Sequence, residues 1–129
     1  MAIIDAELMF SKDQKPDGVS EIIDLKAPGD AVGQELTIHV VATETADLEE
    51  GGIVIIQLVT SDTREEGAGQ FEVVLQSGSI YAEKVVKGAE IFCVRVPHGL
   101  KRYVALKYVL DGGMFDNGGK ITAYMSKEL

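Results

Sequence analysis

The sequence has no tryptophan, a single cysteine and no long hydrophobic segment. Because Cys93 has no second cysteine to pair with, the fold must depend on packing alone, as in a reducing compartment. No run approaches the roughly 18 apolar residues that a membrane span requires. The opening "MAIIDAELMF" has two acidic residues and neither a basic region nor a long apolar core, so we expect no secretion signal and a soluble protein made in the cytoplasm.

Basic residues are also scarce, since 12 Lys and Arg stand against 21 Asp and Glu, for a net charge of -9. A general nucleic-acid binder needs a basic surface, so this class is excluded. Residues 1–66 carry 15 acidic and 4 basic groups, whereas residues 67–129 carry 6 acidic and 8 basic groups. This asymmetry either steers assembly or reflects two sheets with differently solvated faces.

Catalytic signatures are missing as well. The two histidines, His39 and His98, belong to no spaced metal-binding pair, and the sequence has no G-x-S-x-G motif and no P-loop. Cys93 has no His or Asp beside it in "IFCVRV", which favours a small buried or half-buried side chain over a nucleophile. The loop "DGGMFDNGG" lacks the spacing of a calcium site. We therefore predict no catalytic, metal-binding or cofactor-binding residues, and no enzyme activity.

What the chain does have is a series of short segments with β-branched and aromatic residues, separated by glycine-rich turns. This pattern predicts one domain over residues 1–129, built as an antiparallel sandwich or barrel. The best helix candidate, residues 80–87, is short and could instead be a strand. We expect strands at 21–25, 34–43, 52–60, 70–76, 90–97, 101–110 and 120–126.

The strand expected at 101–110 has one apolar face and one mixed face, because side chains alternate along a strand. The apolar face, which should meet the core, consists of Val104, Leu106, Tyr108 and Leu110. The mixed face consists of Tyr103, Ala105, Lys107 and Val109. This second face carries more apolar and aromatic surface than solubility needs, so we predict that Tyr103, Lys107 and Val109 contact a second protomer or another partner.

Other apolar residues lie where exposure would be costly. Residues 1–11 form an apolar leader in an acidic half of the chain, and this leader is either a docking segment or an ordinary edge strand of its own domain. Together with the mixed face, the predicted interface residues are Ile3, Ile4, Leu8, Phe10, Tyr103, Lys107, Val109, Met114, Phe115 and Tyr124. We also predict that deleting residues 1–10 abolishes partner binding.

Four stretches of the sequence resemble the Bbp16-like family of tailed-bacteriophage capsid cement, or decoration, proteins. They are "MAIIDAELMFS", the early "IIDL", "VPHGLKRYVALKYVLDGG" and the closing "GGKITAYM". The likeness runs from end to end of the chain in the same order, and its specificity lies in the combination. The resemblance is loose over "SDTREEGAGQ" and "SIYAEKVVKGAE", and it gives no residue list for capsid contact.

The resemblance implies a jelly-roll-like β-sandwich with no enzymatic activity and no cofactor. It implies a homo-oligomer, a dimer or trimer, that binds the phage major capsid protein on the outer surface of the virion after assembly in the host cytoplasm. Neither a membrane nor a nucleic acid is an expected partner. Many weak contacts repeated by the shell's symmetry would supply the holding strength.

Two other functions fit a β-sandwich. A glycan- or receptor-binding module usually requires a platform of exposed aromatic side chains, but the chain has no tryptophan and only 6% aromatic residues. A cupin-like metal enzyme would want two or three histidines with a glutamate, but the two histidines lie about 60 residues apart. Glycan binding would support the first function, and stoichiometric metal in the purified protein would support the second.

Overall fold

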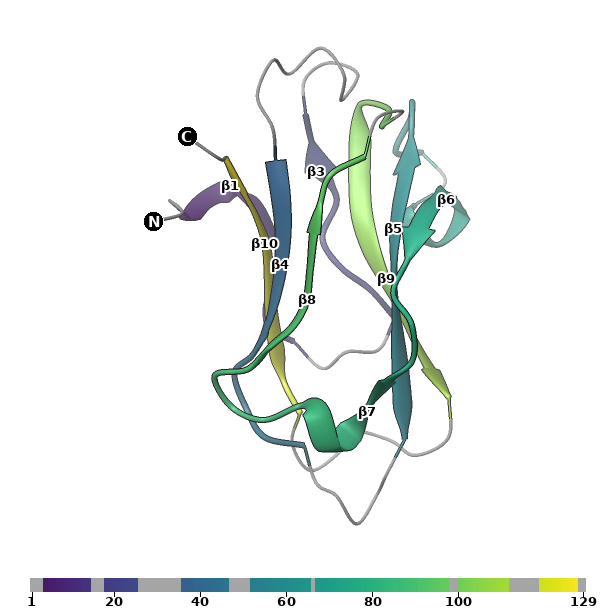
Figure 1. Ribbon diagram of the computed structural model, residues 1–129. Helices are drawn as coiled ribbons and strands as arrows, with labels where there is room; N and C mark the ends of the chain where they lie inside the picture. Colours follow the sequence, from purple (N-terminus) through teal and green to yellow (C-terminus); the bar gives the residue numbers. More distant parts are fainter. Residues whose placement is uncertain are drawn as a thin grey trace.

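The computed structural model describes residues 4–14, 18–25, 36–46, 52–65, 67–97, 100–111 and 119–127. These residues form two antiparallel sheets that pack face to face, with a short 3-10 turn at two places (Figure 1). The predicted all-β sandwich is therefore confirmed. No helical segment within these ranges has the length and apolar character needed to cross a lipid bilayer.

The first sheet, sheet A, contains four strands in the order β1-β10-β4-β8. Its strands are β1 (Ile4–Gln14), β10 (Ile121–Lys127), β4 (Leu36–Ala42) and β8 (Glu90–Arg95). β10 and β4 occupy the centre, and β1 and β8 form the two edges. The beginning of β1 lies beside the end of β10, with Ile4 opposite Ser126 (Figure 1).

The second sheet, sheet B, is built around the long pair of β9 and β5, with β2 and β6 outside them. Its main strands are β2 (Gly18–Val19), β9 (Tyr103–Asp111), β5 (Ile53–Ser61) and β6 (Glu72–Gln76). Two short strands complete the sheet, as β3 (Ile23–Asp24) pairs with β9 and β7 (Ile80–Tyr81) pairs with β5. Of the expected strand at 21–25, only these two β3 residues are in regular strand conformation.

The core between the sheets follows the alternation read from the sequence. On β9, Val104 and Leu106 are fully buried and Tyr108 is 2% exposed, so the apolar face of this strand meets the core as predicted. On β10, Ile121, Ala123 and Met125 are fully buried on the same principle. The two central strands of each sheet thus contribute most of the apolar surface that stabilises the sandwich.

A second, smaller cluster covers part of the outer face of sheet B. The 3-10 turn η2 (Ala68–Gln70) and Phe71 pack there on Val59 and Ala105. This contact explains why β5 is apolar on both faces near its end. It also places Ala105, on the mixed face of β9, fully inside the molecule.

Residues 80–87 form no helix of regular length. The chain makes β7 and then the single 3-10 turn η3 (Ala82–Lys84) at one end of the sandwich (Figure 1). Val85, which follows η3, is completely buried. The carbonyl oxygen of Val85 accepts a hydrogen bond from the amide of Ala46 at 2.8 Å. Because a segment this short cannot hold a helix by itself, these tertiary contacts decide its conformation.

The edge strand β1 is irregular and is tied to sheet B. Its pairing with β10 shifts register three times, and such irregularities bend a strand locally. The amide of Glu21 donates to the carbonyl of Phe10 at 3.0 Å, and the hydroxyls of Ser11 and Tyr108 are hydrogen-bonded at 2.8 Å. The part of β1 from Met9 onward is thereby held against both sheets.

The buried phenol of Tyr108 makes the free energy of unfolding depend on pH in the alkaline range. Burial raises the pKa of Tyr108, and the hydrogen bond with Ser11 offsets part of this effect. The phenol ionises near pH 10 in the unfolded chain and at higher pH in the native state, so its contribution to stability is complete below about pH 10 and declines above it. The free energy of unfolding should fall by up to about 1.4 kcal/mol per pH unit from this group.

Urea unfolding of the wild-type protein and of Tyr108→Phe, from about pH 8 to pH 11, measures this contribution. At about pH 8, loss of the Ser11 hydrogen bond should lower the variant's free energy of unfolding by about 1 kcal/mol. Above about pH 10 the variant's free energy of unfolding should decline less steeply than that of the wild type. Parallel curves for the two proteins would contradict the role given to Tyr108.

Candidate functional site

Polar side chains cluster on the outer face of sheet A, which is the face turned away from the core. Tyr124, His39 and Cys93 lie opposite one another on three adjacent strands, β10, β4 and β8. Their neighbours Ile38 and Val40 are fully buried on the opposite face of β4. The alternation of β4 therefore directs His39 outward.

A β-bulge in β8 adds Glu90 to this face. Cys93 pairs with His39 and Phe92 with Val40, but the register then shifts so that Glu90 pairs with Val41. Two consecutive residues, Ile91 and Phe92, consequently pack on the core. In a regular strand, Glu90 and Cys93 would lie on opposite faces, and the bulge returns Glu90 to the face that carries His39.

His39 makes contacts through both ring nitrogens. Its Nε2 lies 2.9 Å from the hydroxyl of Ser126, and its Nδ1 lies 3.4 Å from a carboxylate oxygen of Glu90 and 3.7 Å from the sulfur of Cys93. The ring of Tyr124 stacks on the imidazole with 5.1 Å between ring centroids. These contacts from the two flanking strands, β10 and β8, fix the position of the imidazole, and the His39 side chain is 15% exposed.

The carboxylate of Glu90 is the more accessible member, with 44% of its side chain exposed. Hydrogen bonds from Cys93 and His39, together with the charge of His39, hold the pKa of Glu90 below its usual range against the opposing effect of burial. Cys93 is exposed. The expectation of a buried or half-buried thiol is therefore wrong, because Phe92 and Val94 take the core side of β8.

Ser126, His39 and Glu90 are connected like the serine, histidine and acid of a hydrolase triad, but Ser126 cannot act as the nucleophile. Ser126 is 0% exposed, so no substrate carbonyl can reach its hydroxyl. Its function is to hold the imidazole. What the arrangement offers to solvent is a nitrogen, a carboxylate oxygen and a sulfur, all within 4.8 Å of one another. Nitrogen, oxygen and sulfur together are a ligand set for a metal ion.

The predicted interface residues of the leader lie in different environments. Ile4 begins β1 opposite Ser126, and Ile3 lies outside the described residues. Leu8 is half-buried and packs against the main core. Phe10 is fully buried within that core. Its assignment to the interface is therefore wrong, because its ring fills space between the protein's own two sheets.

The predicted interface residues of the mixed face are half-buried. The Tyr103 ring packs against the small outer cluster, with the guanidinium groups of Arg102 and Arg64 at 5.1 and 5.7 Å from its centroid. Arg102 also donates two hydrogen bonds to Asp24, at 2.8 and 2.9 Å. Side chains of the same chain thus surround much of Tyr103, so part of the mixed face of β9 contacts its own domain.

Lys107 and Val109 continue the same face of β9 and are likewise half-buried, opposite Gln57 and Ile55 of β5. Tyr124 stacks on His39 on the other sheet, so it is not next to the mixed face of β9. Met114 and Phe115 lie outside the described residues. The predicted interface residues therefore divide between sheet A and sheet B.

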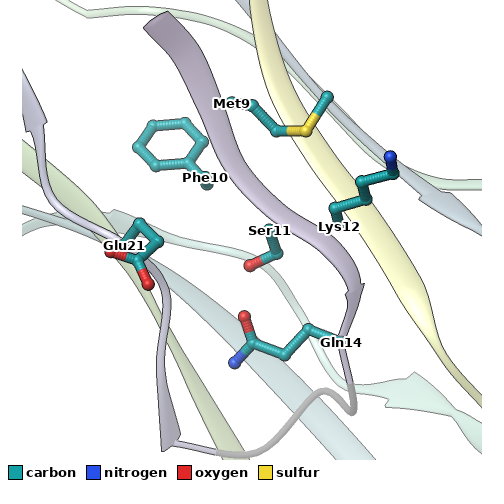
Figure 2. A pocket seen from close by; sticks show the side chains of 6 residues that line it. All are labelled: Met9, Phe10, Ser11, Lys12, Gln14 and Glu21. Carbon is teal, nitrogen blue, oxygen red and sulfur yellow. The ribbon is translucent and has the colours of Figure 1, made fainter. Parts of the chain in front are cut away.

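A hollow lies at the seam where β1 meets the segment after β2. Figure 2 shows its lining, which is Met9, Phe10, Ser11, Lys12, Gln14 and Glu21. The side chain of Gln14 donates to the carbonyl of Val19 at 3.2 Å and so bridges the two segments. The lining mixes apolar and charged groups, and it makes this edge of the sandwich an uneven surface.

A family model matches residues 18–125, and the family is Bbp16. The chain belongs to the Bbp16 family. A comparison with curated proteins found no match. The region shared with Bbp16 begins at β2, so it includes His39, Glu90 and Cys93 but leaves out β1.

The structure of this Bbp16 member also exposes apolar residues that the sequence did not single out. Tyr81 and Val86 flank η3 with about half of each side chain exposed, at 52% and 48%. They lie in the stretch where the resemblance to the family was loose. Val85 lies between them in the sequence and is fully buried, so neighbouring apolar residues in this segment differ in exposure.

Proposed function

We propose that this protein is a non-enzymatic capsid cement protein. It binds the outer surface of a phage head and stabilises contacts between neighbouring major capsid proteins. The observation that carries the proposal is membership of the Bbp16 family over residues 18–125, since this is the family whose phage cement proteins the sequence resembles. The protein acts as a homo-oligomer and is part of the virion.

The architecture suits a cement protein. Two sheets joined through a continuous apolar core form a stiff body, because close-packed interiors deform little. β1 begins at the open edge of sheet A, and the described contacts of this strand with residues 18–21 all lie at Phe10 or beyond. Residues 4–8 thus offer a strand edge to which a capsid protein segment can add.

Many weak contacts are sufficient for this function. Each copy needs only a modest interface, since an icosahedral shell repeats the same contact at every equivalent position. The half-buried residues of the β9 mixed face provide a second surface, on the opposite sheet, for another protomer or a neighbouring capsid protein. With contacts on both sheets, one molecule can connect two partners.

Co-sedimentation with expanded, undecorated capsids of the phage that encodes the protein tests the proposal. The protein should pellet with the capsids in a saturable manner, with a fixed number of copies per capsid protein at saturation. The same protein should stay in the supernatant without capsids. A folded protein that shows no saturable pelleting with these capsids would overturn the proposal.

A further inference from the structure

The outer face of sheet A combines the side chains of His39, Glu90 and Cys93 in a way that the cement function does not use. Their nitrogen, oxygen and sulfur atoms come from two adjacent strands and lie within 4.8 Å of one another. Imidazole, carboxylate and thiolate are the three side-chain groups that zinc binds in proteins.

The two separations that involve His39 Nδ1 also suit ligands of a single metal ion. The His39 Nδ1 lies 3.4 Å from the Glu90 oxygen, whereas good hydrogen bonds between nitrogen and oxygen are about 2.9–3.0 Å long. Around a tetrahedral zinc ion with ordinary bond lengths, a nitrogen and an oxygen ligand stand about 3.3 Å apart, and a sulfur and a nitrogen about 3.5 Å. The separation between Cys93 Sγ and His39 Nδ1 is 3.7 Å, close to the second value.

The surroundings of His39 are those of a metal ligand. Its Nε2 bonds to the buried hydroxyl of Ser126, which leaves Nδ1 directed at Glu90 and Cys93. In metal sites, such a hydrogen bond on the second ring nitrogen fixes the tautomer and the orientation of the ring. The stacked ring of Tyr124 restrains the imidazole further.

The bulge in β8 is a second, independent feature that points to a site. Without it, Glu90 would face the core side of the sheet, away from His39 and Cys93. Bulges are frequent next to functional sites because they redirect a single side chain. Exposure of Glu90 and Cys93 gives an ion a direct path from solvent.

We propose that His39, Glu90 and Cys93 form a zinc site with water as the fourth ligand. The thiolate and imidazole favour zinc over magnesium and calcium, which prefer oxygen ligands alone. Bound zinc would connect β4 to the edge strand β8 and stabilise that edge of the sandwich. This inference is independent of the proposed cement function, because its test measures metal binding and not capsid binding. The cluster contains one histidine, whereas a cupin-like enzyme would need two or three, so zinc bound here would not by itself support that alternative.

Titration of the metal-free full-length protein with cobalt(II), under a non-thiol reductant, tests the site. Cobalt(II) is used as the probe in place of zinc, because bound zinc has no visible absorption spectrum. The wild-type protein should bind one equivalent, with a thiolate-to-cobalt charge-transfer band and the visible bands of tetrahedral cobalt, and zinc should then displace it. Zinc should also raise the melting temperature of the protein.

Three variants identify the ligands. Cys93→Ser should lose the charge-transfer band, and Glu90→Gln and His39→Gln should weaken binding by about tenfold or more, since even outer-shell changes cost about 10–100-fold. Glu83→Gln, an exposed acid on η3, is the matched control and should bind like the wild type. Absence of the band in the wild type, or equal cobalt binding by Cys93→Ser and the wild type, would overturn the proposal.

Discussion

Replacing Phe10 by alanine should lower the free energy of unfolding by about 3–5 kcal/mol, which is the usual cost of deleting a buried aromatic ring. Phe10 is fully buried and belongs to the main core. Its carbonyl also accepts the hydrogen bond from Glu21 that holds β1 against the segment after β2. Loss of the ring leaves a cavity at this junction, so β1 should loosen from the sandwich as the protein is destabilised.

Chemical unfolding monitored by circular dichroism measures this effect. Met9→Ala is the matched control, because Met9 is the neighbouring residue on β1 and is only half-buried at the edge hollow (Figure 2). The control should cost about 1 kcal/mol or less. Equally small losses for the two variants would contradict the placement of Phe10 in the core and would return it to the candidate interface.

Removal of residues 1–7 should weaken capsid binding by about tenfold or more, which corresponds to a loss of about 1.4 kcal/mol. The sequence suggested a deletion of residues 1–10. The structure favours the shorter deletion of residues 1–7, because the longer one would also remove Phe10 from the core. The shorter deletion keeps the pairing of Met9, Ser11 and Gln14 with β10 and the hydrogen bond between Ser11 and Tyr108. The sandwich should therefore remain folded while the start of the edge strand β1 is lost.

Binding isotherms from capsid co-sedimentation measure the change, with thermal unfolding as the check of the fold. Val73→Ser is the control variant, since Val73 lies on β6 at the far edge of sheet B and is 47% exposed. This control should bind capsids like the wild type. Unchanged binding by a folded deletion variant would remove the leader from the mechanism and leave the β9 mixed face as the candidate surface.

The longer strands β4, β5, β6, β8, β9 and β10 could be predicted from the sequence because alternation and turn residues are local signals. The apolar face of β9 followed directly from period-two spacing, and the buried residues of β10 have the same spacing. The short β7 and η3 could not be predicted in this way, since the burial of Val85 and its bond with Ala46 decide their conformation. Phe10 was misassigned because an apolar leader has the same sequence pattern as an edge strand that packs on its own core.

The cluster around His39 was missed for a different reason. Glu90 and Cys93 are 51 and 54 residues away from it in the sequence, and their proximity depends on β4 pairing with β8. Alternation assigns residues to the two faces of one strand, but it does not say which strands are neighbours. The bulge that redirects Glu90 has no sequence signal of its own in this chain.

The central claim is that the protein holds a phage shell together from outside. Cryo-electron microscopy of the phage heads, with and without the added protein, tests this claim most directly. We expect density for the β-sandwich on the outer surface, in contact with at least two neighbouring capsid proteins and with the start of β1 at a contact. Heads that stay bare at saturating protein, or density confined to the interior or the tail, would contradict it.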